Sequence, residues 1–329
     1  MSQKRVCAAL QAAEGAYLSG EELSRSIGIT RAAVWKAVEA LRRQGYDIEA
    51  RTGRGYRLRQ SPDLLRRETV EAYLSAPRAD WEVLESVDST NSACRRLALE
   101  GAEDGTVVMA DCQTAGRGRR NRSFQSPAGR GLFLSILWRP GCTPDKLLPL
   151  TALSAVAVYR AVERVCGVNL RIKWPNDLVL NGKKLGGILT EMALEGESGL
   201  VSHAVVGIGI NVHHLPSDFE GQVRDIATSL DMELDGRVCR GKLAAALLEE
   251  LDYLRGEVLF APEKWLEPYR TACLNIGQTV QLIRGETRER VEAVAVDGQF
   301  GLVVRHENGE LETVRSGEVS VRGLYGYAE

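Results

Sequence analysis

Several signatures of common protein classes are absent from this 329-residue sequence. It contains no 18-residue apolar run and no apolar segment near its N-terminus, so neither membrane spanning nor export is expected. The seven cysteines are odd in number and widely spaced, without a C-x-x-C pair, which excludes a disulfide framework and a zinc site of that type. Reduced thiols of this kind predict a cytoplasmic protein.

The usual motifs of nucleotide and hydrolase chemistry are also missing. No Rossmann fingerprint, nucleophile elbow or H-E-x-x-H motif occurs, and the four histidines lack the spacing of a metal site. Residues 236–243 match G-x-x-x-x-G-K, but a P-loop needs Ser or Thr where Leu243 stands, and a buried strand before it. This segment therefore predicts the start of a helix, and no resident metal is expected.

Charge is distributed unevenly along the chain, whose net charge is only −2. Residues 1–60 hold eleven Lys and Arg against six Asp and Glu, so the remainder of the chain is acidic. A basic head on an acidic body indicates that the head has an anionic partner of its own.

The basic head has the pattern of a helix-turn-helix. Residues 5–13 predict a first helix. Ser19 followed by Glu22 forms a capping box that opens a second helix, and Gly28 is suited to end it. A third helix is expected from residue 31 to about 44, with apolar residues along one face. Two helices joined by a tight glycine-containing turn are typical of DNA-binding domains, in which the second helix enters the major groove.

A basic hairpin follows the third helix. Residues 46–51 and 56–58 alternate apolar and polar side chains around a Gly-rich centre, which predicts two strands and a winged helix-turn-helix. Its arginines would contact phosphates or the minor groove. The predicted DNA-binding residues are Arg31, Trp35, Lys36, Arg43, Arg51, Arg54 and Arg57. Two alternatives remain: a small helical adaptor with a solvated hairpin, and a Trp35 that packs against the wing instead of facing DNA.

The body alternates strands with helices. Residues 1–62 form the head, and residues 63–79 predict a linker with an amphipathic helix over 64–74. Residues 80–271 form the body. Its expected strands are 81–87, 106–110, 132–138, 183–191 and 204–211, with a bent strand over 171–180. Three helices are expected: one that is capped by residues 88–91 and ends at residue 99, and two over residues 147–165 and 237–260.

The most unusual stretch of the body is the basic loop at residues 113–127. It holds four arginines in six positions and two nearby glycines, without a carboxylate. Arginine suits phosphates and carboxylates, and glycine lets backbone approach a ligand. The alternative is a solvated basic surface loop. Because the loop is a long excursion between two expected neighbouring strands, we interpret it as a mobile lid that closes on an anion.

Four further polar motifs lie at the ends or bends of these elements. Residues 88–91 open a helix, where they either hold a polar ligand or simply cap the helix. Residues 173–177 contain Pro175, which puts the following Asn and Asp on a bend. Residues 184–189 form a return strand after an Asn-Gly turn, and the glycines of residues 207–211 allow close backbone approach.

Together these motifs resemble the biotin–protein ligases, in the bifunctional form that also represses biotin-synthesis genes. The motifs occur in the family's order, and the resemblance runs from the winged helix to the C-terminus. Two positions depart from the family pattern, with Asn121 where Gly is usual and Phe124 where Trp is usual. Altered loop dynamics and retained activity are expected, because Asn tolerates unusual backbone angles and Phe keeps the ring.

The resemblance implies a two-step reaction and a set of site residues. Biotin and ATP, with Mg²⁺ on the phosphates, form biotinyl-5′-AMP, and a lysine of the biotin carboxyl carrier protein then takes the biotin. The implied biotin-binding residues are Ser89, Thr90, Asn91, Gln113, Gly116, Arg117, Gly118, Arg119 and Lys184. The implied ATP or adenylate residues are Arg117, Arg119, Arg122, Asn176, Lys184 and Asn211. The implied catalytic residues are Lys184, Asp177 and Arg119, although Asp177 could also be only a turn residue.

Fold and partners follow from the same resemblance. The implied fold is mixed α/β, with a winged helix-turn-helix, a central mixed-sheet domain like that of class II synthetases, and an SH3-like β-barrel over residues 272–329. The implied partners are the carrier protein, operator DNA and a second copy of the chain when biotinyl-AMP is bound. Two alternatives stay open: a ligand-sensing repressor with little transfer activity, and a lipoate–protein ligase relative.

The tail predicts short strands at 279–283, 290–296, 301–305 and 318–321, with Asp297-Gly298 and Asn308-Gly309 as turns. A small barrel of this kind would help to hold ATP or the carrier protein, or would serve only as a packing module.

Overall fold

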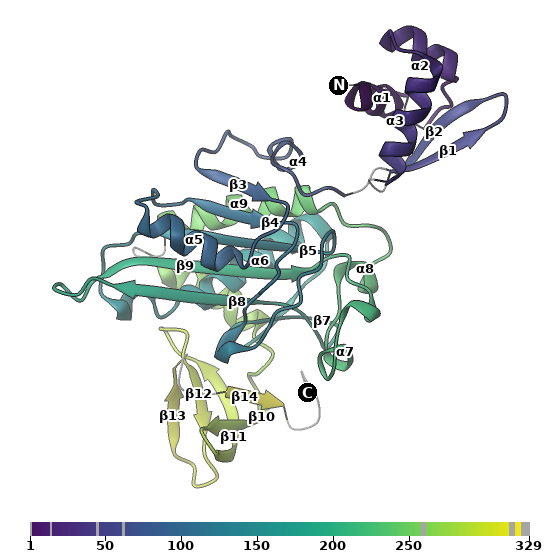
Figure 1. Ribbon diagram of the computed structural model, residues 1–329. Helices are drawn as coiled ribbons and strands as arrows, with labels where there is room; N and C mark the ends of the chain where they lie inside the picture. The colour runs from purple at the N-terminus through teal and green to yellow at the C-terminus, as the bar shows by residue number, and fades with distance from the viewer. Residues whose placement is uncertain are drawn as a thin grey trace. The chain divides into compact units, whose positions relative to one another are not determined.

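The computed structural model describes residues 2–13, 15–43, 46–60, 63–257, 261–315 and 320–323. The chain divides into two compact units, Met1–Leu64 and Leu65–Glu329 (Figure 1). The division comes close to the change from basic to acidic sequence.

The first unit is the predicted winged helix-turn-helix. Its elements are α1 (Ser2–Ala12), α2 (Gly20–Ile27), α3 (Arg31–Arg43) and the antiparallel strands β1 (Asp47–Arg51) and β2 (Gly55–Gln60). The capping box is confirmed, because Ser19 Oγ accepts from the Glu22 N–H at 3.1 Å and Glu22 accepts from the Ser19 N–H at 2.7 Å. Gly28 ends α2 at φ 71°, in the left-handed region.

The linker differs from the prediction. A helix was expected over residues 64–74, but α4 spans only Arg67–Glu71. Leu65 and Val70 are buried in the hydrophobic core of the second unit, and the Ser75 N–H donates to Glu249 at 2.8 Å. Burial of two apolar side chains therefore ties this segment to the second unit. The expected Ser-Pro boundary at 61–62 lies outside the described residues.

The second unit is built on a seven-stranded sheet of order β3-β4-β5-β9-β8-β7-β6. Strands β3 and β4 pair in parallel, and the other pairs are antiparallel. The strands are β3 (Trp81–Leu84), β4 (Val107–Ala110), β5 (Gly131–Trp138), β6 (Arg171–Lys173), β7 (Asp177–Leu180), β8 (Lys183–Leu194) and β9 (Val201–Asn211). Asn181 and Gly182 both have positive φ in the β7–β8 turn, as the Asn-Gly signal predicts.

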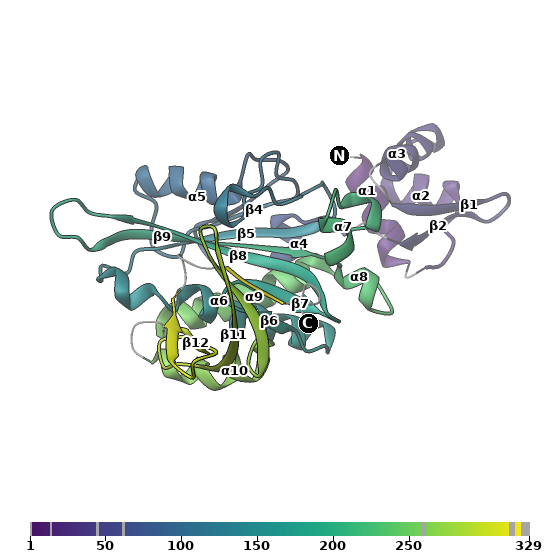
Figure 2. The same ribbon diagram turned by 90° about the horizontal axis from the view of Figure 1, so that it is seen from below.

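Helices cover both faces of this sheet (Figure 2). Helix α5 (Thr90–Leu99) packs against Val108, Leu137 and Val205 on one face. Helices α6 (Leu150–Cys166) and α9 (Arg240–Glu257) cover the other face, and both begin three residues later than expected. Residues 258–260, the expected end of α9, lie outside the described residues. The smaller elements are η1 (Arg119–Asn121), η2 (Pro144–Leu147), η3 (Pro216–Asp218), α7 (Val223–Ile226), α8 (Leu230–Glu233), η4 (Pro262–Trp265) and α10 (Leu266–Ala272).

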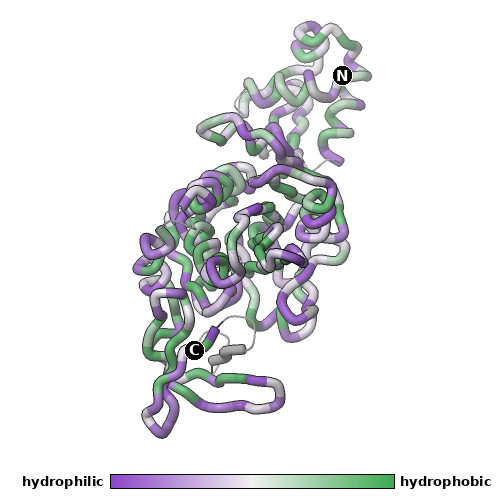
Figure 3. The backbone as a smooth tube through the Cα atoms, turned by 90° about the vertical axis from the view of Figure 1, so that its left-hand side faces the viewer, coloured by the Kyte–Doolittle hydropathy of each residue, from purple (hydrophilic) through white to green (hydrophobic). Residues whose placement is uncertain are grey.

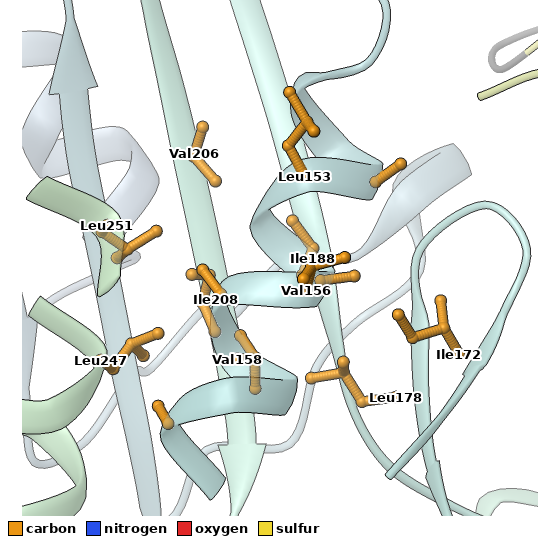
Figure 4. Close-up of a cluster of buried hydrophobic side chains, with 14 of the residues drawn as sticks. Leu153, Val156, Val158, Ile172, Leu178, Ile188, Val206, Ile208, Leu247 and Leu251 are labelled. Carbon is orange, nitrogen blue, oxygen red and sulfur yellow. The ribbon is translucent and has the colours of Figure 1, made fainter. Parts of the chain in front are cut away.

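The main core lies between the sheet and the α6–α9 layer (Figure 4). Val156 of α6 and Leu247 of α9 face Val206 and Ile208 of β9, and all four are nearly inaccessible to solvent. Alternation along β9 sends Val205 to the α5 face and Val206 to this one. Figure 3 shows hydrophobic stretches running through the middle of this unit, with hydrophilic stretches at its margins. Among the described helices, none is both long enough and apolar enough to cross a bilayer.

The tail forms an antiparallel sheet of order β13-β12-β11-β10-β14. The strands are β10 (Gln278–Arg284), β11 (Thr287–Val296), β12 (Leu302–Arg305), β13 (Leu311–Val314) and β14 (Ser320–Gly323). Strand β13 was not predicted. Within the described residues the sheet is open, so the expected SH3-like barrel is not confirmed. Trp174 Nε1 donates to the Phe300 carbonyl at 3.0 Å, which ties this sheet to the β6–β7 turn.

Candidate active site

One cavity of about 990 Å³ lies over the β7–β8–β9 part of the sheet, below the basic loop. The predicted residues that line it are Ser89, Thr90, Asn91, Gln113, Arg117, Gly118, Arg119, Arg122, Asn176, Asp177, Lys184 and Asn211. Gly116 is buried behind this wall, and a Cβ there would lie 2.3 Å from the Phe124 carbonyl oxygen. The cavity therefore brings together residues that lie up to 122 positions apart, from Ser89 to Asn211.

The start of α5 forms the neutral end of the cavity. Ser89, Thr90 and Asn91 are all buried, and the Ser89 side chain makes no cap hydrogen bond, so simple capping does not account for this motif. Thr90 instead donates to Gln113 Oε1 from its N–H at 2.9 Å and its hydroxyl at 3.2 Å. Gln113 Nε2 donates in turn to Ser126 Oγ at 2.8 Å. Helix α5 is thereby joined to both ends of the basic loop.

Ser135 of β5 supports this end from below and was missed in the sequence. Its hydroxyl lies 2.8 Å from Thr90 Oγ1 and 2.6 Å from Asn91 Oδ1, fully buried. Gly207 leaves room for the Asn91 amide, because a Cβ at that position would lie 1.9 Å from Asn91 Oδ1. A serine within an apolar strand carries no local signal, so only the fold reveals it.

The basic loop is folded as a flap, which we define as residues 113–127. Hydrogen bonds from the Gly118 N–H to Arg122 (2.7 Å) and from the Phe124 N–H to Gly116 (2.8 Å) make it a small hairpin. Arg120 turns the tip at φ 55°. The Phe124 ring lies over Gly209, where a Cβ would come within 2.8 Å of it. The flap is therefore seated on the sheet and is not a solvated strand connection.

The flap arginines take different directions. Arg119 Nη1 donates to Asn176 Oδ1 at 2.9 Å across the cavity, and burial lowers the pKa of this guanidinium from its ordinary value. Arg117 pairs with Glu191 of β8 at 2.8 Å. Arg122 is exposed at the rim. The charge of the loop is thus spread around the cavity mouth.

A lysine and a carboxylate meet at the charged end. Lys184 Nζ lies 2.6 Å from Asp177 Oδ1, and Asn176 Nδ2 approaches the same oxygen at 3.3 Å. Lys173 also lines the cavity and is buried, with only 6% of its surface exposed. Lys173 is the first residue of the 173–177 motif, but it was not among the predicted site residues. The cavity is thus lined both by cations and by neutral polar groups. This combination suits a ligand that has an anionic group and an uncharged polar part.

The far wall comes from a segment that the sequence did not suggest. Residues 219–223, with Ile226 and Ala227, line the cavity around α7. The Thr228 N–H donates to the Lys184 carbonyl at 2.9 Å, and Asn211 Nδ2 donates to the Thr228 carbonyl at 2.9 Å. This segment is therefore bonded to the strands that carry two predicted site residues.

The predicted DNA-binding residues in the first unit fall into two groups. Trp35 is 55% exposed on α3, with Lys36 and Arg43 also exposed on this helix. Arg54 stands at the hairpin tip, where its guanidinium lies 5.9 Å from the Tyr17 ring centroid.

The other predicted arginines are paired with acids. Arg31 pairs with Glu21. Glu49 binds Arg51 at 2.9 Å and Arg57 at 2.6 Å. Glu21 and Glu49 belong to the six acids of the head, but the sequence did not indicate these pairs, which partly neutralise the basic surface.

Comparison with known proteins agrees with this division of the chain. Residues 83–211 match the biotin/lipoate A/B protein ligase family, and residues 3–57 match a helix-turn-helix domain. The bifunctional ligase/repressor BirA of Bacillus subtilis is 34% identical over 93% of this chain and 94% of its own, and that of Escherichia coli is 32% identical over 94% of each. The biotin protein ligase of Aquifex aeolicus, solved with biotin and ATP, superposes with a TM-score of 0.64 at 28% identity, covering 75% of this chain and all of that one.

Proposed function

The chain belongs to the family of bifunctional ligase/repressors, and from this premise we propose that it biotinylates a carrier protein and represses transcription. The enzyme is a biotin–[acetyl-CoA-carboxylase] ligase that uses biotin and ATP. The observation that carries the ligase function is the cavity itself, which Lys184 and Arg119 line together with the buried Thr90 and Asn91.

The first step joins two anions. A biotin carboxylate oxygen attacks the α-phosphorus of ATP, the α–β bond breaks, and biotinyl-5′-AMP and pyrophosphate form. Repulsion between the reactants must be offset, which Lys184 between them and Arg119 and Arg122 at the phosphates would do. Mg²⁺ would enter on the ATP phosphates and neutralise part of their charge.

The neutral end of the cavity suits the uncharged ring of biotin. Thr90, Asn91 and Gln113 offer donors and acceptors already oriented by one another and by Ser135. The flap backbone around Gly116 and Gly118, with Ser89 opposite, completes the biotin site. Asn211, the last residue of β9, also lines the cavity and would contact the adenine.

In the second step the lysine amine of the biotin carboxyl carrier protein attacks the carbonyl carbon of the mixed anhydride, and AMP leaves. The incoming amine must lose a proton, and Asp177 is the carboxylate at the charged end. Because biotinyl-AMP hydrolyses in water, a flap closed over it protects it until the carrier arrives.

The winged head would bind operator DNA of biotin-synthesis genes, with biotinyl-AMP as co-repressor. The exposed Trp35, Lys36 and Arg43 of α3 and Arg54 of the wing support this assignment. We propose a homodimer as the DNA-bound form, a cytoplasmic location, and the boundaries 1–62, 63–79, 80–271 and 272–329 with a closed C-terminal barrel.

The test of the ligase uses the full chain with biotin, Mg-ATP and a carrier domain. Biotin on the carrier lysine is the expected result, detected by mass. An unlabelled carrier would overturn the enzyme assignment and leave a ligand-sensing repressor. The same assay is run in parallel with lipoate in place of biotin. Faster labelling of the carrier with lipoate than with biotin would make the chain a lipoate ligase.

DNA binding is tested separately. Operator fragments obtained by binding-site selection should shift in a gel more strongly when biotin and ATP are both present. A gel shift of equal strength with and without biotin and ATP would overturn the co-repressor model, but it would not bear on the ligase assignment.

A further inference from the structure

The carboxylate of Glu191 joins the flap to the start of α5. Its Oε1 accepts from Arg117 Nη2 of the flap at 2.8 Å, and its Oε2 accepts from Asn91 Nδ2 at 2.9 Å. Arg95 of α5 approaches Oε1 from the other side at 3.5 Å. One side chain on β8 thus holds three groups that come from two separate parts of the chain.

We propose that Glu191 is a positioning residue that clasps the flap closed and couples this closure to occupancy of the polar end of the cavity. The clasp is the pair Arg117–Glu191. The catalytic consequence rests on the proposed ligase function, whereas the Arg117–Glu191 contact does not depend on it.

Other contacts join the flap to the second unit near its two ends: the Thr114 and Ala115 N–H groups donate to the Val87 and Asp88 carbonyls, and the Phe124 ring packs over Gly209. Glu191 instead holds Arg117, close to the tip of the hairpin. The hairpin hydrogen bonds are internal to the flap and move with it, and the Gln113–Ser126 pair fixes only its base. Arg119 crosses to Asn176, but Arg119 is a cation assigned to the adenylate and would exchange Asn176 for phosphate oxygens. Glu191 does not line the cavity, so a bound ligand would not displace its carboxylate, which remains available to Arg117.

The coupling follows from the shared carboxylate. Asn91 lines the cavity, and its amide nitrogen also lies 3.3 Å from the Leu189 carbonyl, so its Nδ2 has two possible acceptors. A ligand that orders Asn91 keeps the amide on Glu191, which in turn holds the oxygen aimed at Arg117. Ligand binding and flap closure therefore favour each other.

Exposure of the pair suits a reversible clasp. The Glu191 side chain is 22% exposed and that of Arg117 is 40% exposed. Partial solvation weakens an ion pair, so this one contributes enough to bias the flap without locking it. A flap that must release AMP and admit a carrier lysine in each turnover requires such a bond.

Hydrogen exchange of the ligand-free full-length protein tests the clasp. Amides 118 and 124 are bonded within the flap hairpin, and amide 113 at its base. In Glu191→Gln, which keeps the side-chain shape and removes the charge, peptides covering 113–127 should exchange about tenfold faster. Glu195→Gln is the control, since Glu195 lies on the turn beyond β8, where its carboxylate accepts from the hydroxyl of the nearby Ser198 at 2.7 Å. Exchange in Glu191→Gln that equals both wild type and control overturns the proposal.

Arg117 variants separate a clasp from a general structural role. Arg117→Lys should exchange more slowly than Arg117→Gln, because it keeps the charge, and this difference should vanish when Glu191→Gln is also present. A persistent difference in the double variants would mean that Arg117 acts on another partner and would overturn the clasp. The thermal midpoint, recorded alongside, should be the same for both double variants.

The coupling is tested on the adenylate. Loss of preformed biotinyl-AMP from the protein after gel filtration should be about tenfold faster in Glu191→Gln, with a smaller change in the biotin KM. An unchanged loss rate overturns the coupling. Failure of wild type to make the adenylate would instead refute the proposed function and leave the exchange result standing.

Discussion

Lys184 Nζ and Asp177 Oδ1 lie 2.6 Å apart, on the two strands of the β7–β8 hairpin. The tight Asn181–Gly182 turn sets the register of this hairpin, and a bulge between Leu178 and Val179 adjusts it. The cation proposed for the first step and the carboxylate proposed for the second are therefore positioned by one short hairpin, and each holds the other in place.

Asp177→Asn should separate the two steps. Lys184 remains, so adenylate formation should change only slightly, whereas transfer to the carrier should slow by about 10²-fold because the amine loses its proton acceptor. Pyrophosphate release measures the first step, and single-turnover labelling of the carrier from preformed biotinyl-AMP measures the second. Equal losses in both would mean that Asp177 serves only to hold Lys184.

Arg119→Ala should let biotinyl-AMP escape. The variant loses both the bridge to Asn176 and a cation at the adenylate, so release should rise by about tenfold or more. The free adenylate in the filtrate is the measurement. Arg288→Ala removes the same charge from an exposed site on the C-terminal sheet and should release it at the wild-type rate.

Gly207→Ala should damage the biotin end of the cavity. The new methyl group would displace the Asn91 amide, which would lose its contacts with Ser135 and Glu191, at a cost of roughly 1–3 kcal/mol in stability. The KM for biotin should rise more than that for ATP. Gly196→Ala, which meets no atom within 4 Å, is the control. A variant with unaltered biotin KM would show that Asn91 does not contact biotin.

Glu49→Gln should strengthen DNA binding by the head. Glu49 now holds Arg51, Arg57 and Arg59 at 2.6–3.0 Å, in competition with DNA phosphates. Each arginine released to a phosphate should steepen the plot of log K against log salt by about 0.9. Fluorescence anisotropy over a range of salt gives the slope, with Glu71→Gln as the control for net charge. A slope equal to that of the control would place these arginines away from DNA.

The pH dependence of stability should report His214. Burial lowers its pKa to about 4, with Asp218 opposing that shift and Arg130 reinforcing it. An unfolded histidine titrates near 6.5, so the unfolded chain binds the proton first. The contribution of His214 to the free energy of unfolding should be fully present above pH 6.5, and it should fall by roughly 3 kcal/mol as the pH drops to 4. Urea unfolding of wild type and His214→Phe, which retains a ring against Phe219, should differ in this window and run parallel above it.

Local patterns predicted the elements well. The Ser19–Glu22 box, Gly28 and the Asn181–Gly182 turn depend on a few neighbouring residues, and each occurs as expected. The predicted linker helix was too long because apolar spacing over residues 64–74 does not show that Leu65 and Val70 would be buried separately in the second unit.

The sequence by itself indicated a basic head on an acidic body, most strands and helices, the family resemblance and part of the cavity lining. The tertiary structure decided which residues from distant parts of the chain are in contact. The contacts of Ser135 with Thr90 and of Glu191 with Arg117 join residues 45 and 74 positions apart, and the wall from 219 to 227 comes from a loop without regular pattern. Such contacts arise from the order of strands in the sheet, which periodicity and capping signals do not encode, because these signals report only the conformation of a residue and its near neighbours.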